Sequence, residues 1–100
     1  MPLTNERKKQ YRSIGHTLNP VVTIAGKGLT EAVLEEVNRA LEDHELIKVK
    51  LAIVDRDLRK QVVEQLCQQS RAESVQEIGK VVLLYRAAQK PNPRLSNILR

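Results

Sequence analysis

The chain has 100 residues, 41% hydrophobic content and a net charge of +5, which predicts one small basic domain with a single core. No apolar run approaches the roughly 20 residues of a membrane-spanning helix, and the N-terminal residues lack the apolar segment of a secretory signal. We therefore expect a cytoplasmic protein without a membrane partner. The excess of cations favours a polyanionic partner, either nucleic acid or a ribosome-like particle, because basic side chains release counterions from phosphates.

The chain is poor in the residue types that carry base stacking or catalysis. Its aromatic residues are Tyr11 and Tyr85, too few to stack successive bases, so phosphate contacts and shape should dominate any RNA binding. Cys67 is the single cysteine and falls on the apolar face of a predicted helix, which is typical of a small buried thiol. Two distant histidines and no Gly-x-x-x-x-Gly-Lys motif indicate no enzyme, and we expect no cofactor, metal or small-molecule substrate.

A basic helix is predicted from Thr4, its N-cap, to about Ser13, with Gly15 ending it. Its cations outnumber its acids by more than solubility needs, so it is either a solvated face or part of a binding surface. These cations are Arg7, Lys8, Lys9 and Arg12.

The stretch from Val21 to Thr30 predicts a strand that leads into a helix through the loop Gly26-Lys27-Gly28. Glycines let the backbone approach a ligand, free N–H groups at a helix N-terminus attract anions, and Lys27 adds a full charge. The junction is therefore either a phosphate site or only a tight turn. Thr30 should cap the second helix, which runs to about Asp43 and has an acidic outer face.

The remaining elements complete an α-β-α-β-α-β-β order. Residues 46–53 alternate as a strand with Lys48 and Lys50 on the face opposite the core, where they are either solvated or available to a ligand. A helix over 56–70 follows its cap Asp55, and its early cations Arg56, Arg59 and Lys60 oppose the helix dipole, which mildly favours a nearby anion.

Two strands, over 72–78 and 81–86, should form a hairpin around Gly79-Lys80. A helix between the first two strands implies that they are parallel. We expect an α/β fold of two layers, with a mixed four-stranded sheet packed by helices. Residues 1–86 should form the domain, and residues 87–100 should be a flexible basic tail.

Over residues 3–86 the sequence resembles the CRM domain family (chloroplast RNA splicing and ribosome maturation), in particular its stand-alone bacterial YhbY-like members. The matching stretches are Leu18-Asn19-Pro20-Val21-Val22, Gly28-Leu29-Thr30-Glu31, His44-Glu45-Leu46-Ile47-Lys48-Val49-Lys50, Asp55-Arg56, Ile78-Gly79-Lys80 and Leu83-Leu84-Tyr85-Arg86. The resemblance implies a fold similar to the C-terminal domain of a bacterial translation initiation factor, no enzymatic activity, and RNA binding in precursors of the large ribosomal subunit.

The resemblance also implies a Gly-x-x-Gly loop that is similar to the RNA-clamping loop of KH domains. Ala25 occupies the first glycine position here, so either Gly26 sets the turn or the position tolerates a side chain. The predicted RNA-binding residues are Gly26, Lys27, Gly28, Arg7, Lys8, Lys9, Arg12, Lys48, Lys50 and Arg86. The alternative is a protein-interaction module that docks on a ribosomal protein or another acidic partner.

Overall fold

The computed structural model describes residues 3–26 and 28–98. The helices are α1 (Asn5–Gly15), α2 (Glu31–His44) and α3 (Arg56–Ser70), and the strands are β1 (Pro20–Ile24), β2 (Leu46–Leu51), β3 (Glu73–Ile78) and β4 (Val81–Tyr85). Each helix begins directly after its predicted cap, because the side chains of Thr4, Thr30 and Asp55 accept hydrogen bonds from N–H groups of the first turn. Within the described ranges no helix is long and apolar enough to cross a membrane.

Within those ranges the strands form one mixed sheet in the order β1-β2-β4-β3. β1 and β2 are parallel, whereas β4 is antiparallel to both of its neighbours. Pro20 lies on the edge strand β1, where its missing N–H group costs no central hydrogen bond. The turn between β3 and β4 has Gly79 at φ +55°, a conformation that suits glycine. This architecture confirms the predicted α/β fold.

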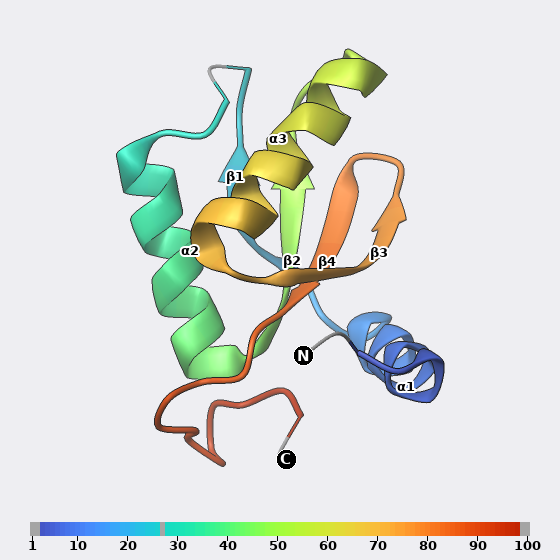
Figure 1. Cartoon of the computed structure of the whole chain (residues 1–100), viewed down its shortest axis with the longest axis vertical. Helices are drawn as coiled ribbons and strands as arrows, with labels where there is room; N and C mark the ends of the chain where they lie inside the picture. Colours follow the sequence, from blue (N-terminus) through green and yellow to red (C-terminus); the bar gives the residue numbers. More distant parts are fainter. Residues whose placement is uncertain (1–2, 27, 99–100) are drawn as a thin grey trace.

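The two faces of the sheet are covered differently (Figure 1). Alternate residues of β2, among them Ile47 and Val49, face the main core, which α2 and α3 complete. On the opposite face α1 packs Tyr11 against Leu46 and Leu83 near one end of the sheet. The rest of that face carries no helix in the described part of the chain, and we call it the open face.

The described part of the C-terminal segment, residues 87–98, lies against the end of α2 (Figure 1). The buried carboxylate of Glu45 accepts hydrogen bonds from the Ser96 hydroxyl and the Ala88 N–H group, each at 2.9 Å. The Asn97 side-chain amide donates to the Leu46 carbonyl at 2.6 Å. The segment is therefore packed on the domain instead of extending away from it, while its flexibility and the boundary at residue 86 stay predictions.

Candidate nucleic-acid interface

A backbone hydrogen bond closes the loop between β1 and α2. The Gly28 N–H group donates to the Ala25 carbonyl at 2.9 Å, and Gly28 has φ +79°. Of the described residues other than glycine, only Glu45 and Arg71 have positive φ, so Ala25 adopts an ordinary conformation. The first glycine position thus tolerates a side chain, and Gly28 bears the left-handed conformation. Lys27, the predicted charge of this loop, lies outside the described residues.

Gly28→Ala should lower the free energy of unfolding by about 1 to 2 kcal/mol, because a Cβ disfavours the left-handed region. Gly26→Ala is the matched control, since Gly26 has no positive φ and a Cβ there meets nothing within 4 Å. It should change stability by less than about 0.5 kcal/mol. Urea unfolding of both variants measures the difference, and equal losses would contradict the assignment of the turn to Gly28.

Two other connections lie beside this loop at the same end of the sheet. The Ala52 N–H group donates to the Ile24 carbonyl at 2.7 Å, and the Leu51 N–H group donates to the Lys80 carbonyl at 2.6 Å. The loop after β1, the loop after β2 and the β3–β4 turn are therefore neighbours. We call this end of the sheet the loop end.

Several cations at the loop end were not among the RNA-binding residues predicted from the sequence. Arg56 and Lys60 are exposed in the first turns of α3, and Lys80 is exposed in the β3–β4 turn. The guanidinium of Arg59 instead donates to the carbonyls of Ile53 and Val54, at 2.7 and 2.9 Å, and so fixes the chain after β2. The sequence indicated an anion near the first cations of α3. Only the order of the strands in the sheet places these cations at the same end as the loop between β1 and α2.

Lys48 and Lys50 lie on the open face. They share a side of β2 with Leu46, which packs under α1, and this side is opposite to the one that faces the main core. Lys50 is exposed between Thr23 and Val81, and Lys48 is partly buried beside Leu83. The two lysines thus occupy the middle of the open face.

The cations of α1 lie at the end of the molecule away from the loop end, along its longest dimension of 35 Å (Figure 1). Lys9 and Arg12 are exposed on the helix face that leads to His16, while Lys8 is partly buried. The Arg7 guanidinium lies 3.4 Å from the Tyr11 hydroxyl, to which it donates. The predicted site residues are therefore not one cluster, and Lys50 and Lys48 lie between the two cationic ends.

The structure gives Arg86 an internal role. Its guanidinium donates to the Asn38 side chain at 2.9 Å, to the Asn38 carbonyl at 3.1 Å and to the Ser70 carbonyl at 2.7 Å. These contacts join α2 to the end of α3 on the side of the sheet opposite the open face. Arg86 is therefore engaged within the protein, and the interface proposed below does not include it.

The sequence model of the CRS1 / YhbY (CRM) domain family matches residues 3–86, which is most of the sequence. The chain belongs to the CRS1/YhbY (CRM) domain family. A probable RNA-binding protein of Pseudomonas aeruginosa is 59% identical over 100 residues, covering all of this chain and 96% of that protein. An RNA-binding protein of Haemophilus influenzae is 40% identical over 93 residues, covering 93% of this chain and 94% of that protein.

A solved CRM-like structure has the same fold. The solution structure of a Staphylococcus aureus protein described as an RNA-binding candidate matches with a TM-score of 0.78 and 32% identity. The match covers 89% of this chain and 93% of that one. The resemblance stated from the sequence is confirmed, and the α/β fold with a mixed four-stranded sheet matches that of a CRM-domain structure.

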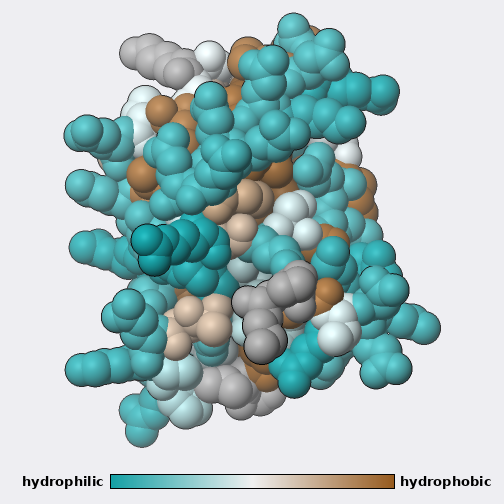
Figure 2. Space-filling model, viewed as in Figure 1, coloured by the Kyte–Doolittle hydropathy of each residue, from teal (hydrophilic) through white to brown (hydrophobic). Residues whose placement is uncertain are grey.

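The face of this CRM domain that α2 and α3 cover is mainly hydrophilic, with smaller hydrophobic areas among the hydrophilic residues, as Figure 2 shows. On α2 the exposed residues include Glu31, Glu35 and Glu36, against one exposed cation, Arg39. The open face, in contrast, presents Lys48 and Lys50. The acidic residues of α2 and the two lysines of β2 thus lie on opposite sides of the sheet, in keeping with the acidic outer face predicted for the second helix.

The potentially reactive side chains of this CRM domain are partly buried. Burial raises the pKa of the Cys67 thiol, and nearby Glu77 and Glu73 raise it further, so the reactive thiolate is disfavoured. Burial likewise raises the pKa of Tyr85, whose ring packs on Tyr11 with 5.0 Å between the ring centroids. Among the residues that the structure describes, no group of three His, Cys, Asp or Glu side chains could hold a metal ion.

Proposed function

We propose that this CRM-family chain is a non-catalytic RNA-binding protein and that its open face carries the RNA. The observation behind the proposal is the position of Lys48 and Lys50 between two cationic ends, with the acidic residues of α2 on the other side. An RNA backbone on this path would meet the loop end, then the two lysines, then Lys9 and Arg12 of α1. The RNA-binding names of the relatives support the same class of partner.

Phosphate contacts should supply most of the affinity. The packing of Tyr11 on Tyr85 beneath α1 leaves neither ring as an open platform for successive bases. At the loop end, the first N–H groups of α2 and the charge of Lys27 would hold one phosphate. The cations along the path would fix further phosphates and so position a folded RNA without reading its sequence.

We further propose that the RNA is ribosomal RNA in cytoplasmic precursors of the large ribosomal subunit, and that the chain acts during ribosome assembly. The resemblance to stand-alone bacterial YhbY-like members supports this choice. The basic character of the whole chain, with a net charge of +5, suits a particle made largely of RNA.

The affinity for RNA should fall steeply with salt. If four to six phosphates are neutralised, the logarithm of the association constant should decrease against the logarithm of salt concentration with a slope of roughly −3 to −5. Fluorescence anisotropy with a labelled RNA hairpin, repeated from low to high salt, measures this slope. An affinity that does not respond to salt would contradict the electrostatic account.

A protein-interaction module remains the rival function, with the basic surface serving to steer the chain to an acidic partner. Purified large-subunit precursors, loaded with the chain and then digested with ribonuclease, separate the two functions. Release of the chain together with RNA fragments supports RNA binding. Retention on RNA-free ribosomal protein would overturn it.

A further inference from the structure

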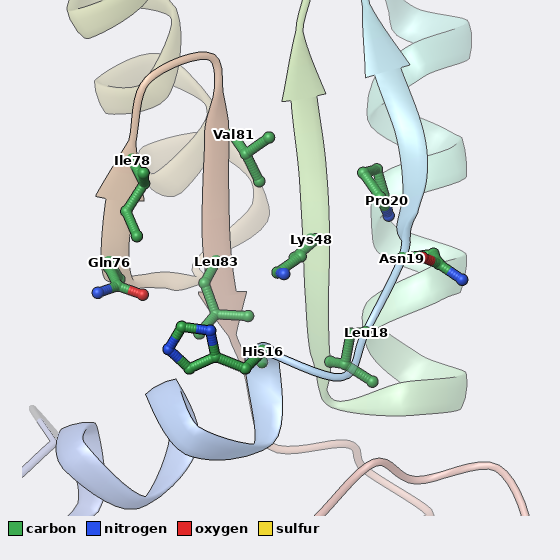
Figure 3. Close-up of a pocket in the computed structure, with 10 residues that line it drawn as sticks. His16, Leu18, Asn19, Pro20, Lys48, Gln76, Ile78, Val81 and Leu83 are labelled. Carbon is green, nitrogen blue, oxygen red and sulfur yellow. The ribbon is translucent and has the colours of Figure 1, made fainter.

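A pocket opens on the open face where α1 ends. It encloses about 370 Å³ between His16, which follows α1, and strands β2, β3 and β4 (Figure 3). This volume falls within the range of roughly 300 to 1,000 Å³ that small-molecule sites occupy. Leu83 and Val81 form an apolar floor, and Ile78 on the neighbouring strand is 59% exposed.

The polar side chains around this floor have no internal partner among the residues that the structure describes. In residues 3–26 and 28–98, the side chains of His16, Lys48 and Gln76 make no hydrogen bond or ion pair with the protein. Figure 3 shows the His16 ring beside Leu83, with Gln76 across β4 from Lys48. A planar ring, an amide and an ammonium group therefore surround one apolar surface.

This combination fits an unpaired base and its phosphate. Histidine rings stack on bases, a glutamine amide can form two hydrogen bonds with an adenine edge, and lysine attracts phosphate. Because Tyr11 and Tyr85 pack on each other, His16 is the aromatic group that the described open face offers to a base. An apolar peptide or a lipid could contact Leu83, Val81 and Ile78, but it would leave the Gln76 amide and the Lys48 ammonium group without polar partners.

We propose that this pocket receives one unpaired base of the bound RNA, with His16 against the ring, Gln76 on its edge and Lys48 on the adjacent phosphate. The inference rests on the proposed RNA-binding function and extends it. It adds recognition of an exposed base to a surface that otherwise contacts the backbone. Fully paired RNA would not fill the pocket, so the protein should prefer RNA with an unpaired nucleotide.

Two strands of equal charge test the pocket. One is an adenosine RNA of about eight nucleotides, and the other has the same ribose-phosphate backbone without bases. The wild-type protein should bind the adenosine strand about tenfold more tightly, which is the size expected for one stacked base. His16→Ala and Gln76→Ala should each reduce this ratio while leaving the affinity for the base-free strand unchanged.

Gln10→Ala is the matched control, because Gln10 is exposed on α1 and does not line the pocket. It should keep the wild-type ratio, and a melting curve should show each variant folded. A lower ratio in at least one pocket variant supports the proposal. A wild-type ratio near one, or a ratio that both pocket variants leave unchanged, overturns the pocket while RNA binding stands. Binding to the labelled hairpin but to neither strand likewise overturns the pocket, and binding to none of the three RNAs overturns the proposed function as well.

Discussion

Arg86→Ala should lower the free energy of unfolding by about 3 kcal/mol. The guanidinium donates three hydrogen bonds, to the side chain and carbonyl of Asn38 and to the carbonyl of Ser70. Hydrogen bonds to charged groups contribute about 1.5 to 3 kcal/mol each, but bonds made by one group do not add fully. For a domain of this size the melting temperature should fall by roughly 12 to 24 °C. Calorimetry measures both quantities.

Arg39→Ala is the control for lost charge, because Arg39 is exposed on α2 and its loss should have little effect on stability. Below its melting temperature the Arg86→Ala protein should bind RNA within about twofold of wild type, apart from the small loss of steering charge. If stability were unchanged and RNA affinity fell instead, Arg86 would belong to the interface and its internal role would be wrong.

The double variant Lys48→Glu with Lys50→Glu should bind RNA about 100-fold more weakly at low salt. It removes two cations from the middle of the open face and places carboxylates against phosphates. A loss of about 3 kcal/mol corresponds to that factor. Anisotropy with the same labelled hairpin measures the change. The slope of log affinity against log salt concentration should become shallower by about 2, because two phosphate contacts are lost.

The matched control for this variant is Arg39→Glu with Lys90→Glu, which changes the net charge equally. Both residues are exposed. Arg39 lies on α2, and the Lys90 backbone N–H group donates to the Glu42 carboxylate of α2 at 3.4 Å, so both lie away from the open face. The control should lose less than about fivefold in affinity, through long-range charge alone. Equal losses in the two double variants would mean that net charge, and not the open face, determines binding.

Local chemistry explains why most of the fold could be predicted. The bounds of α3 follow from Asp55, whose carboxylate accepts from two first-turn N–H groups, and from the helical spacing of its apolar residues. The hairpin follows from Gly79, which supplies the positive φ. Ends set by tertiary partners were less accurate. β2 stops at Leu51, short of the predicted residue 53, because its neighbour β4 begins at Val81.

The candidate site could be predicted only in part. The alternation of β2 correctly places Lys48 and Lys50 away from the main core. The role of Arg86 depends on Asn38, 48 residues distant in sequence, and no local pattern reports such a contact. The packed C-terminal segment likewise depends on Glu45 and Ser96, which are 51 residues apart. No sequence motif marks His16, because its place in the pocket depends on how α1 packs against the sheet.

Nuclear magnetic resonance titration with a short RNA hairpin tests the central claim most directly. If RNA lies on the open face, the amide signals of Gly28, Thr23, Lys50 and Val81 should shift as RNA is added. Those of Glu35, on the outer face of α2, should remain in place. Shifts concentrated on the outer face of α2 and the C-terminal half of α3, with the open face unchanged, would contradict the account.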